Sequence, residues 1–170
     1  MTFSLSYDST TWLFTLLAVL ILFFIISVIL ILGKFKIIKV ILIFGIIIIY
    51  FFAFLRSPKA YIITNSELII KTFSKSIEIP ISSVKEARKL NKYELKGTKR
   101  IKGIGWLFGF SGIFYSRRIG FFEGYFTNQK NLILIKDDKT YVISPDNPNL
   151  FLEKIESQII KRIEEKVQGR

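Results

Sequence analysis

The sequence predicts a membrane-anchored α+β protein, in which a two-helix transmembrane hairpin precedes a strand-rich domain that ends in an amphipathic helix. Three observations predict this architecture: two long apolar runs near the N-terminus, short β-rich runs separated by turn residues, and a final segment of helical period. The 170-residue chain is 51% hydrophobic, which is high for a soluble domain.

Both apolar runs are long enough to cross a membrane. Residues 12–32 contain no charge, glycine or proline, and at about 1.5 Å per residue they span the roughly 30 Å hydrocarbon core. Residues 37–55 follow a short loop, residues 33–36, and their one charge, Lys39, lies near the start, where its side chain can snorkel. We therefore expect two transmembrane helices in a tight hairpin rather than a buried core helix.

Residues 1–11 are expected to form an N-terminal tail. Their only charge is Asp8, so they lack the basic region of a cleaved signal peptide, and we expect the first helix to be retained. Basic residues in the hairpin loop and after the second helix are nearly balanced in number, so the positive-inside rule leaves the orientation open. We expect a multi-pass protein of the cell membrane with a cytoplasmic C-terminal domain, because that domain is basic and the cytoplasmic leaflet is anionic.

The remaining residues, 56–170, have the pattern of one small domain of short strands. Turn residues such as Asn65-Ser66 and Asp137-Asp138 separate the strands, and the second pair marks a hairpin. Residues 81–84 are expected to form a single helical turn. The predicted strands cover residues 60–64, 67–73, 77–79, 85–95, 120–126, 131–136 and 140–143.

A C-terminal helix is expected over about residues 148–167. Asn147 is a suitable N-cap and Pro148 suits the first helical position. Apolar residues recur every four positions on one face: Phe151, Ile155, Ile159, Ile163 and Val167. Because charged residues occupy the other faces, we expect this helix to cap an open β-barrel rather than to lie on a membrane surface.

Several segments of the strand-rich domain follow the order and spacing of a known family. These are residues 61–64 with 68–70, Ile79-Pro80 with Ile81 and Val84, the glycine-rich run 105–112, Gly120, Tyr125, Thr127-Asn128 and residues 142–145. Over about residues 56–165 the chain resembles the bacterial pleckstrin-homology (PH) domain family, specifically small membrane-anchored members with an N-terminal two-helix hairpin. The resemblance implies a PH-like, partly open antiparallel β-barrel of seven strands with a C-terminal capping helix. It also implies a module that binds lipid, peptide or protein, without identifying the ligand.

Positive charge is concentrated in the first half of this domain. The chain carries a net charge of +12, and residues 56–118 hold 14 basic and 4 acidic residues, whereas residues 119–170 hold 8 of each. We expect an anionic-surface binding site formed by Lys85, Arg88, Lys89, Lys92, Lys96, Lys99, Arg100, Lys102, Arg117 and Arg118. Each such residue near an anionic leaflet contributes about 1 kcal/mol. A solvated basic face without a ligand is the alternative.

The glycine- and aromatic-rich insert, residues 103–115, has two interpretations. Its glycines would allow a flexible loop that places Trp106, Phe108 and Phe110 in the membrane interface beneath the basic residues. Alternatively, the glycines form turns and bulges while the aromatic side chains pack the barrel, because small barrels need bulky inward residues. The sequence favours packing and leaves membrane contact open.

The residue types that are absent exclude several classes of function. The sequence has no cysteine and no histidine, which excludes disulfide scaffolds, thiol nucleophiles, histidine-based triads and the usual zinc sites. It also shows no P-loop and no complete dinucleotide-binding fingerprint. We therefore expect no enzyme activity, catalytic residue, metal or cofactor. A basic, aromatic-rich sheet suits single-stranded nucleic acid, but a membrane anchor argues against a nucleic-acid partner.

These features together predict a non-enzymatic membrane protein. Its basic PH-like domain would bind anionic lipid headgroups or a membrane-protein partner at the membrane surface. The alternative is an oligomeric scaffold or assembly subunit, whose PH-like domain makes protein–protein contacts without lipid recognition. The two differ in salt dependence, since attachment to lipid through Lys85 to Arg118 weakens steeply with ionic strength.

Overall fold

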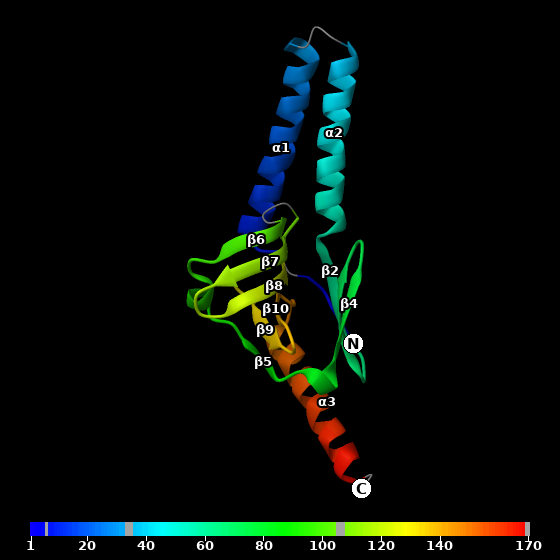
Figure 1. Cartoon of the computed structure of the whole chain (residues 1–170), viewed down its shortest axis with the longest axis vertical. Helices are drawn as coiled ribbons and strands as arrows, with labels where there is room; N and C mark the ends of the chain where they lie inside the picture. Colours follow the sequence, from blue (N-terminus) through cyan, green and yellow to red (C-terminus); the bar gives the residue numbers. More distant parts are fainter. Residues whose placement is uncertain (6, 33–35, 105–107, 169–170) are drawn as a thin grey trace.

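The molecule consists of a helical hairpin joined to a two-sheet domain (Figure 1). The structure, a computed structural model, describes residues 1–5, 7–32, 36–104 and 108–168. Helices α1 (Ser9–Leu32) and α2 (Lys36–Leu55) run side by side in opposite directions and are long and apolar enough to cross a membrane. The Tyr50 hydroxyl of α2 donates a hydrogen bond to the Ala18 carbonyl of α1 at 2.8 Å, which links the two helices.

Most of the first sheet follows α2 almost directly in the chain. Its order is β1-β2-β3-β4, and all neighbouring strands are antiparallel. The strands are β1 (Thr2–Phe3), β2 (Pro58–Ile63), β3 (Glu67–Thr72) and β4 (Ser76–Pro80). The segment expected to be an N-terminal tail thus contributes an edge strand, and the Met1 amino group donates to the Ile63 carbonyl at 2.6 Å.

The second sheet contains six strands in the order β5-β9-β10-β8-β7-β6. Neighbouring strands are antiparallel except for β8 and β10, which are parallel. The strands are β5 (Glu86–Lys89), β6 (Lys99–Ile104), β7 (Phe110–Ser116), β8 (Gly120–Phe126), β9 (Ile133–Lys136) and β10 (Thr140–Ile143). Edge strand β6 lies nearest the helical hairpin, and β5 forms the opposite edge (Figure 1).

Short and long helices complete the domain. The predicted helical turn is confirmed as η1 (Ile81–Ser83), and α3 spans Pro148–Gln168, with the Asn147 side chain accepting the Leu150 N–H at 3.1 Å. The predicted strand over residues 85–95 is wrong in its second half, which forms η2 (Lys92–Leu95). A reciprocal capping box between Asn91 and Glu94 satisfies backbone groups there and favours the helical turn over an extended strand.

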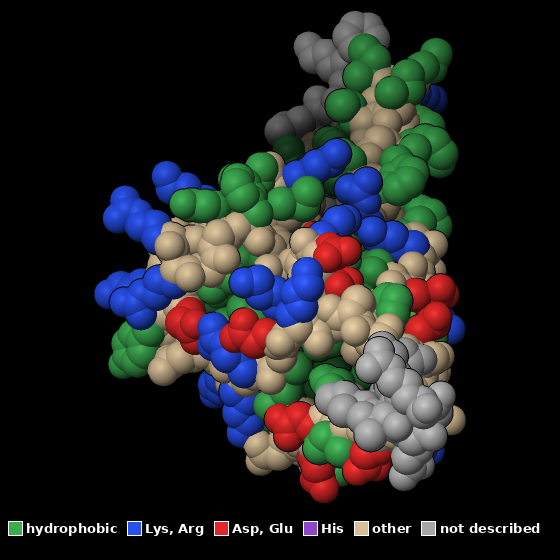
Figure 2. Space-filling model, turned by 60° about the horizontal axis from the view of Figure 1, so that its bottom comes forward, with side chains coloured by type: hydrophobic (Ala, Val, Ile, Leu, Met, Phe, Trp, Pro, Cys, Tyr) green, Lys and Arg blue, Asp and Glu red, His purple; other side chains and the backbone are tan. Residues whose placement is uncertain are grey.

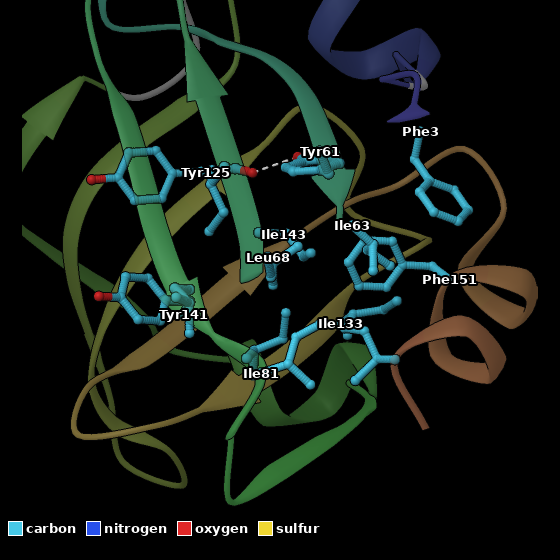
Figure 3. Packing of buried hydrophobic residues seen from close by; sticks show 14 residues of the cluster. Phe3, Tyr61, Ile63, Leu68, Ile81, Tyr125, Ile133, Tyr141, Ile143 and Phe151 are labelled. Atoms are coloured by element: carbon cyan, nitrogen blue, oxygen red, sulfur yellow. Dashed lines mark hydrogen bonds between the residues drawn. The ribbon is translucent and has the colours of Figure 1, made fainter. Parts of the chain in front are cut away.

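The core occupies both faces of the second sheet. One cluster, which includes Tyr61, Ile133, Ile143 and Phe151, fills the space between the sheets and under α3 (Figure 3). A second cluster around Phe114, Phe122 and Phe126 covers the other face. The predicted strand-rich domain with its C-terminal helix is confirmed, and in the described part of the chain the two sheets do not close into a barrel.

The number of strands differs from the seven that the resemblance implied. The two sheets contain four and six strands in the described part of the chain. One additional strand, β1, comes from the N-terminal segment, and the insert 103–115 supplies most of β7 and the end of β6. Two of the insert's glycines, Gly103 and Gly112, lie within a bulged hairpin, Gly109 precedes β7, and Gly105 lies outside the described residues.

The Tyr61 hydroxyl joins the two sheets inside the core. It donates to the Tyr125 carbonyl at 2.6 Å and accepts the Ser144 N–H at 3.2 Å (Figure 3). Burial raises the pKa of the Tyr61 phenol, so the hydroxyl keeps its proton at physiological pH. This residue thereby pairs buried backbone groups that would otherwise lack partners.

Asp8 connects the start of α1 to the second sheet. Its Oδ1 accepts the Thr11 N–H at 2.7 Å as an N-cap, and its Oδ2 accepts the Gln129 N–H at 3.2 Å. Burial alone would raise the pKa of the Asp8 carboxyl, but hydrogen bonds from Thr11 and Gln129 outweigh it, so the pKa lies below its ordinary value. One carboxylate thus fixes a candidate membrane helix to the domain.

The placement of β1 predicts that Phe3→Ala strongly destabilises the domain. The Phe3 side chain is 3% exposed and its ring lies 5.0 Å from that of Phe151. We expect a loss of about 3–5 kcal/mol in the free energy of unfolding, measured by denaturant titration of the full chain in detergent. The control is Phe121→Ala, because Phe121 is 66% exposed. Equal losses for both variants would show that the N-terminal segment lies outside the core.

The lowered pKa of Asp8 predicts acid sensitivity. Because the folded state favours the carboxylate, this stability is fully present above the ordinary pKa of about 3.9 and is lost as pH falls through the lower folded value. Asp8→Asn cannot titrate, so the difference in thermal unfolding midpoint between wild type and variant should shrink below about pH 4. A pH-independent difference would contradict this role for Asp8.

Candidate membrane-surface binding site

The structure divides the basic residues that were predicted to form one surface. Four strands separate β5 from β6, which places the two edges about 24 Å apart at about 4.8 Å per strand. Lys85, Arg88 and Lys89 lie in or beside β5; Lys99, Arg100 and Lys102 lie in β6; Lys96 follows η2; Arg117 and Arg118 form the β7–β8 turn. The side chain of Lys92 lies outside the described part of the structure.

Two of the cations at the β5 edge, Lys85 and Arg88, are paired with carboxylates. The Arg88 guanidinium donates to both Glu94 carboxylate oxygens at 2.7 and 3.0 Å and to Glu86 at 2.7 Å. Hydrogen bonding to Glu94 raises the pKa of Arg88, and the same contact lowers the pKa of the Glu94 carboxyl. Lys85 pairs with Asp138 at 3.0 Å. Arg88 therefore fastens η2 to β5, and its charge is compensated locally.

A second group of cations lies at the side of the domain that faces the hairpin. We call this set the membrane-proximal collar; it consists of Arg56, Lys59, Lys75, Lys99, Arg100 and Lys102. Arg56 directly follows α2, and β6 is the strand nearest the helices (Figure 1). Basic side chains group beside the apolar hairpin in Figure 2. Apart from Arg100, no member has a carboxylate within 4 Å in the described part of the chain.

Sequence reasoning did not assign Arg56, Lys59 or Lys75 to a site. For Arg56 and Lys59 the available signal was their position directly after the second apolar run. Lys75 reaches the same place only through the fold. An aromatic contact fixes them there: the Phe73 ring lies 4.4 Å from that of Phe54 in the last turn of α2, and the Lys59 ammonium lies 5.3 Å from the Phe73 ring. The β3–β4 turn therefore packs against the C-terminal end of α2.

The three aromatic residues singled out in the insert have different surroundings. Phe110 stacks on Phe126 with ring centroids 4.7 Å apart, as part of the second core cluster. Phe108 instead lies 5.5 Å from Phe54, at the end of α2, with a left-handed φ of 57°. Trp106 lies outside the described residues. In the described part of the insert, Phe110 therefore packs in the core from β7, whereas Phe108 contacts the C-terminal end of α2.

A pair of opposed glycines allows β6 and β7 to approach closely. Gly103 and Gly112 are cross-strand partners with φ values of +117° and +147°, which side-chain-bearing residues rarely adopt. A Cβ at Gly112 would collide with the Lys102 carbonyl. The pair therefore requires glycine at both positions and positions Lys102 at the sheet edge.

No metal site accompanies these residues. The described part of the chain contains no group of three or more Asp and Glu side chains that could hold a metal ion. The arrangement of lysines and arginines beside an apolar hairpin can attract anions through charge and hydrogen bonding. These groups are suited to bind an anion.

Comparison with known proteins identifies the two-sheet domain. Residues 59–159 match the family model described as bacterial PH domain. The match covers more than half of the chain and includes β2 through the buried first half of α3. No curated protein and no solved structure gave a significant match.

The glycine pair predicts a large difference between two otherwise similar substitutions. Gly112→Ala should cost more than the about 1–3 kcal/mol of backbone strain alone, because its Cβ would also collide with the Lys102 carbonyl and push β6 away from β7. Gly120→Ala places its Cβ in open space at φ +84° and should cost only about 1–2 kcal/mol. Denaturant unfolding of both full-length variants measures the difference. A Gly112→Ala variant no less stable than Gly120→Ala would contradict the close approach of β6 and β7.

Proposed function

Because the chain belongs to the bacterial PH domain family, we propose that it is a non-enzymatic binding module held at a membrane by two transmembrane helices. Its membrane-proximal collar contacts anionic lipid headgroups. The observation that carries this proposal is the two-residue joint, Arg56-Ser57, between α2 and β2. Two residues span less than about 10 Å, so the collar begins within roughly one Debye length of the hydrocarbon edge.

The position of β1 supports a multi-pass arrangement. Thr2 and Phe3 pair with Ile62 and Tyr61 in one sheet, so the segments before α1 and after α2 share one side of the membrane. Two spans satisfy this requirement, whereas one span does not. We place this side in the cytoplasm, because the anionic leaflet that would attract the collar faces it.

The two transmembrane helices belong to the same chain as the domain, and this determines what the collar contributes to membrane binding. A single transmembrane helix already holds a protein in a bilayer, so attraction at about 1 kcal/mol per cation is not needed for recruitment. It acts on the lipids beside the domain and on the tilt of the domain against the leaflet. The proposed activity is therefore selection of anionic neighbours by a domain that is always present at the surface.

An assembly role is the second candidate, and an exposed apolar strip favours it. Ile101, Ile113, Tyr115 and Phe121 are large apolar residues on β6, β7 and the start of β8, and they are at least 36% exposed. The Tyr115 and Phe121 rings form a cross-strand pair 5.0 Å apart. If this strip joins two copies, Phe121→Ser should convert an oligomer into a monomer in sedimentation experiments on detergent-solubilised protein.

The collar predicts selective, salt-sensitive enrichment of anionic lipid around the full chain. A fragment without residues 1–56 would lose Phe3 and Asp8, so the intact protein is used, reconstituted in bilayers that mix phosphatidylcholine with phosphatidylglycerol. Spin-labelled lipids report which species is immobilised at the protein surface. Lys59→Gln with Lys99→Gln should reduce the preference for phosphatidylglycerol by about fivefold per cation at low salt.

The matched control is Lys154→Gln with Lys161→Gln, which removes the same charge from α3, far from the hairpin (Figure 1). This control should keep the wild-type preference and its decline with salt. Equal preferences in wild type, collar variant and control would refute lipid selection by the collar.

A further inference from the structure

A cleft of about 380 Å³ opens between the β3–β4 turn and strands β6 to β8. Arg56, Lys75 and Lys102 line it from three separate elements: the end of α2, the β3–β4 turn and edge strand β6. Ser74 and Ser111 add two hydroxyl groups. Convergence of cations and hydroxyls from distant parts of the sequence distinguishes this cleft from a general basic surface.

The groups that line the cleft are free to bind a ligand. None of the three cations has a carboxylate within 4 Å in the described part of the chain. The hydroxyls of Ser74 and Ser111 likewise have no hydrogen-bond partner among the described residues. The Lys75 ammonium lies 5.6 Å from the Tyr125 ring, which holds it against the cleft wall. Donors and charge are thus positioned without a protein acceptor.

One acid, Glu123, also lines the cleft, and both of its oxygens are occupied. Lys139 binds Oε1 and the Tyr125 hydroxyl donates to Oε2, each at 3.0 Å. Burial, followed by the charge of Glu123, raises the pKa of Tyr125, so the phenol remains a donor. Among the described lining residues, three cations and one carboxylate leave a net charge of +2. The free capacity of the cleft is therefore for an anion.

We propose that this cleft binds a phosphomonoester, the terminal phosphate of a lipid headgroup. A phosphomonoester carries about −1.5 to −2 charges at pH 7 and three acceptor oxygens, which match the net charge and the several donors of the cleft. A phosphodiester offers one charge and fewer free oxygens. Arg56 directly follows α2, so the cleft lies where headgroups meet the domain. The inference rests on the proposed function and adds a specific headgroup chemistry to it.

The test compares phosphatidic acid with phosphatidylglycerol around the full chain in phosphatidylcholine bilayers, using spin-labelled lipids. Wild type should prefer phosphatidic acid, and Lys102→Gln should reduce that preference about tenfold, the loss expected for a hydrogen bond between charged groups. Lys154→Gln is the control, because Lys154 lies on α3, outside the collar and outside the residues that line the cleft, and it should keep the wild-type preference for phosphatidic acid. Lys75→Gln removes a cation from another element and should repeat the effect of Lys102→Gln.

Two further measurements distinguish a lipid phosphate from a soluble phosphate. They also distinguish failure of the cleft proposal from failure of the collar proposal. Inorganic phosphate added to protein in phosphatidylcholine bilayers, followed by phosphorus NMR line broadening, reports binding of a soluble phosphate in the same cleft. The preference for phosphatidic acid should fall below about pH 6, where a phosphomonoester loses its second charge. No preference over phosphatidylglycerol and no binding of inorganic phosphate would overturn the cleft. Retained enrichment of phosphatidylglycerol would then leave the collar proposal standing, whereas its loss would remove both.

Discussion

Attachment of the domain to both ends of the hairpin is the constraint on which the position of the collar residues relative to the helices depends. At one end α2 runs into β2 with only two residues between them. At the other end the Asp8 carboxylate caps α1 and accepts the Gln129 N–H of the second sheet's loop. One attachment would let the domain swing about a single joint. Two attachments give it one preferred face toward the hairpin, which is the face that carries the collar.

A continuous path of hydrogen bonds carries this constraint into the core. The Ser144 hydroxyl accepts the N–H groups of Thr127 and Asn128, beside the residue that Asp8 binds. The Ser144 N–H in turn donates to the Tyr61 hydroxyl, which donates to the Tyr125 carbonyl. These polar groups are buried, so each lost partner would leave an unpaired group at a cost of about 1–3 kcal/mol. The attachment through Asp8 is therefore next to a hydrogen-bonded group that joins both sheets.

Local sequence patterns were enough to predict most helices and strands. The location of the basic residues depends instead on pairing between strands that are distant in sequence. The apolar runs, the Asn147 cap and the β8 segment each carry their own periodic or capping signal. A two-residue strand such as β1 has no period, and its place depends on pairing with residues about 60 positions away. The basic surface was predicted as one unit because its members are close in sequence. Strand order separates them, since β5 and β6 lie at opposite edges.

Pairing of charges distinguishes the basic residues of the β5 edge from those that line the cleft. Arg88 is held by two carboxylates and stabilises a turn, which a surface ion-pair network does weakly and locally. Arg56, Lys75 and Lys102 have no such partners, and each pays the smaller desolvation cost of an exposed cation. In the proposed function the helices hold the protein in the bilayer, so the attraction of these cations for phosphate acts on which lipids lie beside the domain and on its tilt against the leaflet. In that proposal, modest electrostatic energies select the neighbouring lipids rather than recruit the protein.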